Sequence, residues 1–137
     1  MRRDGRDVVV AGLIAAAVSG APSTTWTLVR GGDVLEGARA AGALLLPREQ
    51  HATVLLAAAV PVHLALSLGW AALLARVLPP RREPLWGALA GLAIATLDLG
   101  VIGRRIAAIR ALDQPAQWAV HLAYGAAVGA VLRARRR

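Results

Sequence analysis

Four apolar stretches, each close to the length that crosses a lipid bilayer, constrain the fold of this chain more than any other sequence feature. A helix crosses the hydrocarbon core with about 20 residues, because each residue adds about 1.5 Å along the axis. The chain is 57% hydrophobic with a mean hydropathy of +0.55, which is too apolar for a soluble domain of 137 residues. The sequence therefore predicts an all-α fold: one domain, residues 1–137, forming an integral membrane bundle of four transmembrane helices. These helices are predicted over residues 8–29, 52–75, 85–103 and 116–132.

The basic residues predict how these helices are oriented. All 16 are arginine and lie in small groups between the apolar stretches, so the net charge of +8 favours membrane topology signals over a nucleic-acid surface. Four crossings place both termini on one side, with ten arginines there and six on the other. The ten are Arg2, Arg3, Arg6, Arg76, Arg81, Arg82, Arg133, Arg135, Arg136 and Arg137, and the six are Arg30, Arg39, Arg48, Arg104, Arg105 and Arg110. Because cytoplasmic segments carry the arginine excess, we expect a multi-pass protein of the inner (plasma) membrane with both termini cytoplasmic.

The first apolar stretch has a second interpretation, as a cleavable secretory signal. The run "MRRDGR", then "VVVAGLIAAAV", then "SGA" has the charged, apolar and small-residue order of such signals. Pro22 would directly follow the cleavage position, and Asp4 and Asp7 reduce the positive charge before the apolar run. These residues favour a retained first helix, which Pro22 is expected to kink because it removes a backbone donor.

A shorter helix is predicted between the first and second apolar stretches, over residues 34–46. Asp33 and Glu36 form a D-x-x-E start signal, and Pro47 provides a stop. Apolar residues recur there at helical spacing, while Glu36 and Arg39 point away from them. The pattern is typical of a helix that lies in the membrane interface or packs on the protein surface.

The loop before the last apolar stretch, "RRIAAIRALDQP", predicts another short helical turn on the same side. It ends with Asp113 as a candidate N-cap and Pro115 in the first turn of the next helix. The last helix is therefore expected to begin near Gln114.

Glycines four residues apart predict where helices pack closely. The third stretch contains Gly87 and Gly91, and the fourth contains Gly125 and Gly129, both at GxxxG spacing. Positions without a side chain let a neighbouring backbone approach, which compensates for the weak hydrophobic drive between helices in lipid. We expect these glycines to form helix contacts, either within one chain or between copies.

Asp98 interrupts the third apolar stretch, and its charge makes it the most informative single residue. A carboxylate in hydrocarbon costs about 2.5 to 3.5 kcal/mol on insertion scales, so Asp98 is expected to face the protein interior and find donors there. Steps of seven and eleven residues place it on the same helix face as Gly91 and Gly87. Counting from the midpoint of each stretch, we expect a polar layer within the membrane. Its members are Asp98, His121, His63, Ser23 and Thr24.

No motif in the sequence specifies a reaction. The chain has no cysteine, and its histidines are too scattered to predict a metal site or a cofactor. The first expectation is therefore a non-enzymatic integral membrane protein with a structural or partner-binding role. Its expected partners are the lipid bilayer and either a second copy or another membrane protein, with no nucleic acid.

Three alternative functions would use the polar layer. An oligomeric transporter or proton relay would use the intramembrane Asp and His residues. Bis-histidine haem binding would use His63 and His121 as axial ligands, although the chain lacks phenylalanine to line a haem pocket. An intramembrane hydrolase would use Ser23, His121 and Asp98, but no nucleophile-elbow sequence surrounds the serine.

Two stretches of the chain resemble uncharacterised small four-helix membrane proteins of high-GC bacteria. They are "HLALSLGWAALLARVLP" and "GRRIAAIRALDQPAQWAVHLAYGAAVGAVLRARRR". The resemblance implies four helices and an inner-membrane location. It implies no activity, cofactor or site residue.

Overall fold

The structure, a computed structural model, describes residues 4–136 and consists there of helices without strands. The all-α class predicted from the sequence is confirmed. Arg2, Arg3 and Arg137, which contribute to the predicted arginine asymmetry, lie outside the described residues. The elements in chain order are α1 (Gly5–Val18), α2 (Ala21–Val29), α3 (Glu36–Gly42), α4 (Ala52–Val77), α5 (Glu83–Leu97), the π-helical turn η1 (Asp98–Ile102), the 3₁₀ turn η2 (Gly103–Arg105), α6 (Ala107–Ala111) and α7 (Gln114–Ala134).

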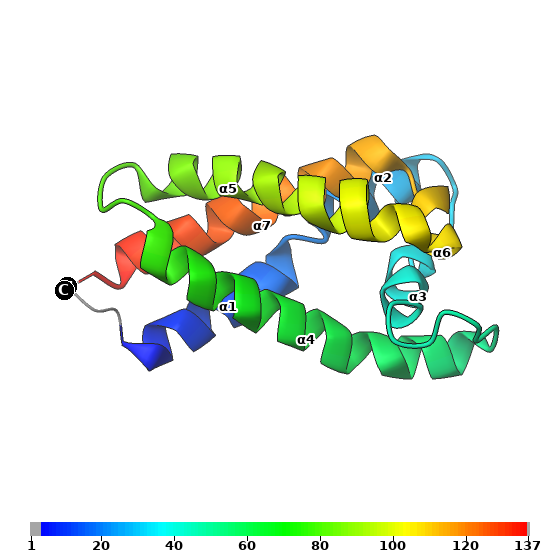
Figure 1. The fold of residues 1–137 in the computed structure, drawn as a ribbon. Coiled ribbons are helices and arrows are strands. Elements are labelled where there is room, and N and C mark those ends of the chain that lie inside the picture. Colours follow the sequence, from blue (N-terminus) through cyan, green and yellow to red (C-terminus); the bar gives the residue numbers. More distant parts are fainter. Residues whose placement is uncertain (1–3, 137) are drawn as a thin grey trace.

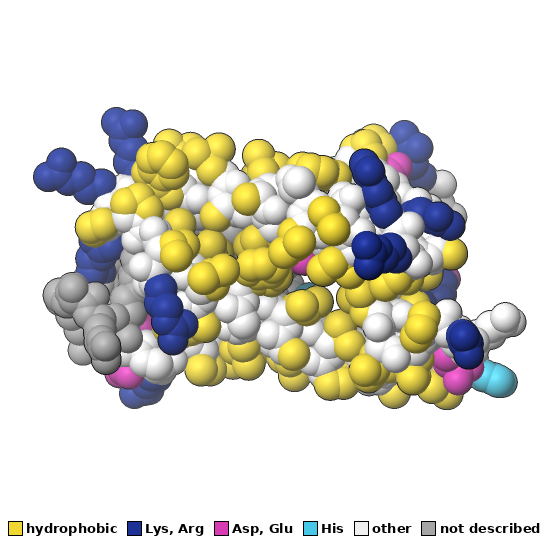
Figure 2. Space-filling model, viewed as in Figure 1, with side chains coloured by type: hydrophobic (Ala, Val, Ile, Leu, Met, Phe, Trp, Pro, Cys, Tyr) yellow, Lys and Arg dark blue, Asp and Glu magenta, His cyan; other side chains and the backbone are white. Residues whose placement is uncertain are grey.

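The long helices run along one axis, and the surface at the two ends of the molecule is more charged than the surface between them. In Figure 1, α1, α4, α5 and α7 extend along the molecule, while α3 stands across it at the end far from the C-terminus. Figure 2 shows arginine side chains gathered toward the two ends, with hydrophobic side chains over the surface between them. A continuous apolar surface of this kind is typical of a region that lies in lipid.

Within residues 4–136, three helical segments are long and apolar enough to cross a membrane: Gly5–Val29, Ala52–Val77 and Glu83–Arg105. They correspond to the first three predicted crossings. The fourth predicted crossing, residues 116–132, forms the 21-residue helix α7, which is not one of these three. The physical reason is its position, because α7 packs against α1, α2, α4 and α5 and so meets protein over much of its surface. A helix surrounded by protein need not be apolar on every side.

The first predicted helix, residues 8–29, is interrupted rather than continuous. α1 ends at Val18, a turn covers Ser19 and Gly20, and α2 begins at Ala21 with Pro22 in its first turn. Proline is accepted at that position because the first backbone N–H groups of a helix have no partner within the helix. The predicted kink is therefore a break between two helices.

α3 is shorter than the predicted helix over 34–46, because turns replace helix at both of its ends. Asp33 precedes it, accepts a hydrogen bond from the backbone N–H of Leu35 (2.9 Å) and pairs with Arg39. The Arg39 guanidinium, followed by that backbone N–H, holds the pKa of Asp33 below its ordinary value of 3.8. At the other end of α3, Gly42 packs directly on the backbone of Leu55 in α4.

α5 and α7 pack antiparallel through the four glycines singled out in the sequence. A Cβ atom added at Gly87 would overlap the carbonyl oxygen of Gly125, and the reverse holds as well. Gly91 meets the carbonyl of His121 in the same way, and Gly129 meets that of Glu83. The contact therefore lies within one chain and extends along most of α5.

The carboxyl end of α7 is held by two ion pairs. Arg135 Nε lies 2.6 Å from Asp7 Oδ1 in α1, and Arg136 Nη2 lies 2.5 Å from Glu83 Oε1 at the start of α5. Arg136 also donates to the carbonyl of Pro80 in the loop before α5 (2.7 Å). The Glu83 side chain is fully buried, so this end of the molecule encloses a charged group.

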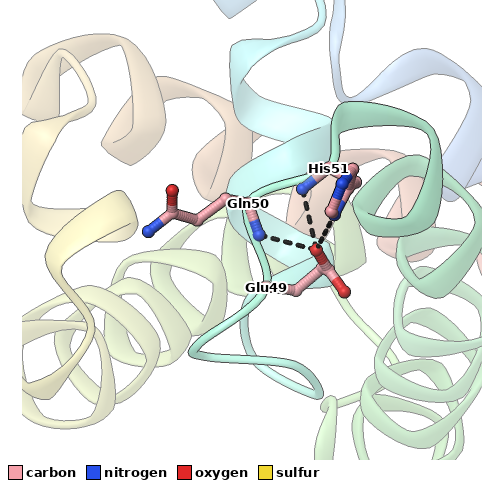
Figure 3. A network of polar contacts seen from close by, with 3 residues as sticks. All are labelled: Glu49, Gln50 and His51. Carbon is pink, nitrogen blue, oxygen red and sulfur yellow. Dashed lines mark hydrogen bonds and ion pairs between the residues drawn. The ribbon is translucent and has the colours of Figure 1, made fainter.

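The start of α4 is organised by the carboxylate of Glu49 (Figure 3). Its Oε1 accepts hydrogen bonds from the backbone N–H groups of Gln50 and His51 and lies 2.8 Å from His51 Nδ1. These contacts, led by the His51 backbone N–H, lower the pKa of Glu49 from 4.5 to about 2. Because the folded-state pKa is depressed, this stabilisation is complete above pH 4.5 and is lost as the pH falls toward 2.

The start of α7 follows the prediction. The helix begins at Gln114, and Asp113 caps it by accepting a hydrogen bond from the backbone N–H of Ala116 (3.2 Å). The same carboxylate accepts a hydrogen bond from Trp26 Nε1 in α2 (2.9 Å), which ties the two helices together. The short turn predicted before it is α6.

Candidate functional site

A cavity of about 640 Å³ lies between α4 on one side and α5, η1 and α7 on the other. α4 packs against α1 and α3, while α5 packs against α7, so α4 and α5 are not paired along their lengths within the described residues. Figure 2 shows a hollow between these two helices, with an acidic side chain inside it. α2, α3 and α6 complete the wall at the end far from the C-terminus.

All five members of the predicted polar layer line this one cavity. Asp98 comes from the turn η1, His121 from α7, His63 from α4, and Ser23 and Thr24 from α2. The sequence predicted an inward face for Asp98 from helical spacing and grouped the others with it by their expected depth in the membrane. Only the packing of four elements brings them to a common space.

Among the members of the predicted polar layer, His121 is the one that pairs with Asp98 in the structure. Asp98 Oδ2 lies 3.5 Å from His121 Nε2, and each of the two side chains is 19% exposed. The other ring nitrogen, His121 Nδ1, lies 2.8 Å from the backbone carbonyl oxygen of Gln117, one helical turn earlier. Both nitrogens of this imidazole therefore face oxygen atoms of the protein.

Two other members of the layer, His63 and Ser23, bond to backbone carbonyls instead of to Asp98. His63 Nε2 lies 3.3 Å from the carbonyl oxygen of Ala16 in α1. Ser23 Oγ donates to the carbonyl of Gly20 (3.1 Å) in the turn before its own helix. The serine hydroxyl thus caps local backbone, which does not favour the hydrolase alternative.

Gln117 and Tyr124 are polar residues that line the cavity and were not predicted from the sequence. Together with His121 they recur at steps of four and three along α7, which is the spacing of one helix face and the signal that identifies them. The Tyr124 hydroxyl donates to the backbone carbonyl of Ser67 in α4 and so connects the two walls. Trp70 also lines the cavity, and its buried indole N–H has no hydrogen-bond acceptor among residues 4–136.

The backbone departs from α-helix at Asp98 itself. α5 ends at Leu97 and continues as the π-helical turn Asp98–Ile102. Such turns insert an extra residue into a helix and occur frequently at functional sites. The altered turn carries Asp98 at its first position, on the side of the cavity.

A smaller pocket of about 60 Å³ adjoins the cavity between α2, α3 and the start of α7. The two spaces share six lining residues, the polar Ser23, Thr24 and Gln117 and the non-polar Val34, Gly37 and Leu112. The outer part of the smaller pocket is lined by three acidic residues, Asp33, Glu36 and Asp113. Polar groups therefore continue from the cavity to the surface near α3.

Within residues 4–136, no cluster of three or more His, Cys, Asp or Glu side chains has an arrangement that would hold a metal ion. Comparisons with family models, curated proteins and solved structures find no match to this chain. The geometry and chemistry of the cavity are therefore the basis on which function is considered.

Proposed function

We propose that the chain is an integral membrane protein with four crossings, in which α7 is the fourth. The support is the pairing of α7 with α5: contacts of Gly129 with Glu83, Gly125 with Gly87 and His121 with Gly91 extend along both helices. If α5 crosses the bilayer, its antiparallel partner covers the same depth. The moderate hydropathy of α7 is compatible with this position because other helices surround it.

The proposed location is the inner membrane, with both termini in the cytoplasm. The Arg135–Asp7 and Arg136–Glu83 ion pairs hold the carboxyl end of α7 beside the starts of α1 and α5, so these segments share one end. That end carries the larger arginine group of the sequence. The expected orientation follows from the excess of arginine on cytoplasmic segments.

Single introduced cysteines test this topology, since the chain contains none of its own. Arg81→Cys and Arg48→Cys each replace an exposed arginine, one in the loop between α4 and α5 and one in the loop after α3. A membrane-impermeant thiol reagent added to intact cells is expected to label only the cysteine at position 48. Both cysteines should react after lysis. Labelling of position 81 alone in intact cells would show that the orientation is opposite to the proposed one.

The partner-binding role expected from the sequence takes a specific form here: non-catalytic binding of a small, mainly apolar molecule within the cavity. The observation that carries this proposal is the cavity itself, whose size is that of small-molecule sites and whose wall is apolar apart from a few convergent polar groups.

A larger side chain in the cavity wall should weaken the binding of an apolar molecule. Nile red, a neutral apolar dye, is expected to bind the purified protein in phosphatidylcholine nanodiscs, and Ala59→Phe, which adds bulk to the wall, should weaken binding by about tenfold or more. Ala57→Phe is the matched control because Ala57 is exposed on α4 and does not line the cavity. Ala41→Phe repeats the test from α3. Equal dye binding by all four proteins would reject the cavity as the site.

A second candidate function is transport or proton relay by an oligomer, favoured by the Asp98–His121 pair inside the cavity. The continuous polar lining toward the smaller pocket gives protons a route to the surface. Haem binding has no comparable support, because both ring nitrogens of His121 face protein oxygens in this geometry.

A further inference from the structure

The charges lining the cavity have one sign. Asp98 is the carboxylate among the residues that line it, and no arginine is among them, although the chain contains 16. The other titratable residues lining the cavity are His63 from α4 and His121 and Tyr124 from α7. An apolar space that is lined by one acidic residue and no arginine favours a positively charged guest over a negatively charged one.

Aromatic rings reinforce this preference. Trp70 and Tyr124 both line the cavity, and aromatic faces attract cations in addition to providing apolar contact. The adjoining smaller pocket adds Glu36 and Asp113 near the surface, while Asp33 in the same pocket is paired with Arg39. No arginine is among the residues that line the smaller pocket.

We propose that the cavity binds an organic cation with apolar substituents, whose positive charge lies beside the carboxylate of Asp98. This inference rests on the proposed binding function and names its ligand class.

Tetraphenylphosphonium and tetraphenylborate provide matched probes, since they have nearly the same shape and opposite charges. Binding is measured with the full-length protein in phosphatidylcholine nanodiscs, with the uptake by protein-free discs subtracted. We expect tetraphenylphosphonium to displace Nile red and to bind at least about tenfold more tightly than tetraphenylborate.

Asp98→Asn separates the ligand class from the cavity. This variant should bind Nile red as the parent protein does and lose at least about tenfold in affinity for tetraphenylphosphonium. Asp4→Asn removes a carboxylate at the start of α1, outside the cavity lining, and should change none of these values. Equal binding of the two ions, or unchanged cation binding by Asp98→Asn, would overturn the inference while leaving apolar binding intact. Failure of Nile red and both ions to bind would instead remove the proposed function.

Discussion

Gly125→Ala should lower the free energy of unfolding by about 3 kcal/mol, the upper end of the usual cost of overpacking. The new methyl group would overlap the carbonyl oxygen and carbonyl carbon of Gly87 and approach the backbone nitrogen of Gly91. Backbone atoms in the middle of a helix cannot rotate away as a side chain does, so α5 and α7 must separate. Separation also loosens the contacts of Gly91 and Gly129, which belong to the same interface.

Reversible unfolding in mixed detergent micelles measures this effect. Gly69→Ala is the matched control, because Gly69 lies inside α4 and a Cβ atom added there would meet nothing within 4 Å. That substitution is expected to be neutral or slightly stabilising, since alanine has the higher helix propensity. If the two variants unfold alike, α5 and α7 do not pack through their glycines.

Arg136→Ala should destabilise the protein by about 1 to 3 kcal/mol, the cost of leaving a buried polar group short of a partner. The Glu83 carboxylate is fully buried and lies 2.5 Å from Arg136 Nη2, whereas Arg136 remains 30% exposed. Removal of the guanidinium leaves negative charge in the interior and also deletes the hydrogen bond to Pro80.

Arg133→Ala provides the comparison, since Arg133 is an exposed arginine in the last turn of the same helix. A double variant in which Glu83→Gln accompanies Arg136→Ala should recover part of the lost stability, because an amide carries no charge to be buried. Thermal melting of the four proteins in one detergent measures both effects. A melting temperature for Arg136→Ala equal to that of Arg133→Ala would show that the ion pair contributes nothing.

Local sequence signals predicted most helices of this fold correctly. Lengths of apolar residues predicted helices that correspond to α4, α5 and α7, and Asp113 with Pro115 predicted the first residue of α7, because a cap acts within one turn. The same kind of signal was less accurate at the first helix, where Pro22 indicated a kink and the structure has a break at Ser19 and Gly20. Proline disfavours the preceding turn but does not determine how the chain passes it.

The polar residues illustrate what only the tertiary structure decided. Periodicity within one helix placed Asp98 and His121 on inward faces, since side-chain direction repeats with the helical turn. Which of several donors meets Asp98 depends on the depth and angle at which α5 crosses α7, and these are determined by backbone contact at the glycines. The cavity depends on contacts between elements that are far apart in the sequence. α4 packs on α1 and α3 and not along α5, and the cavity lies in the space between α4 and α5. No local pattern specifies the separation of two helices, since it results from the sum of all their contacts with the rest of the chain.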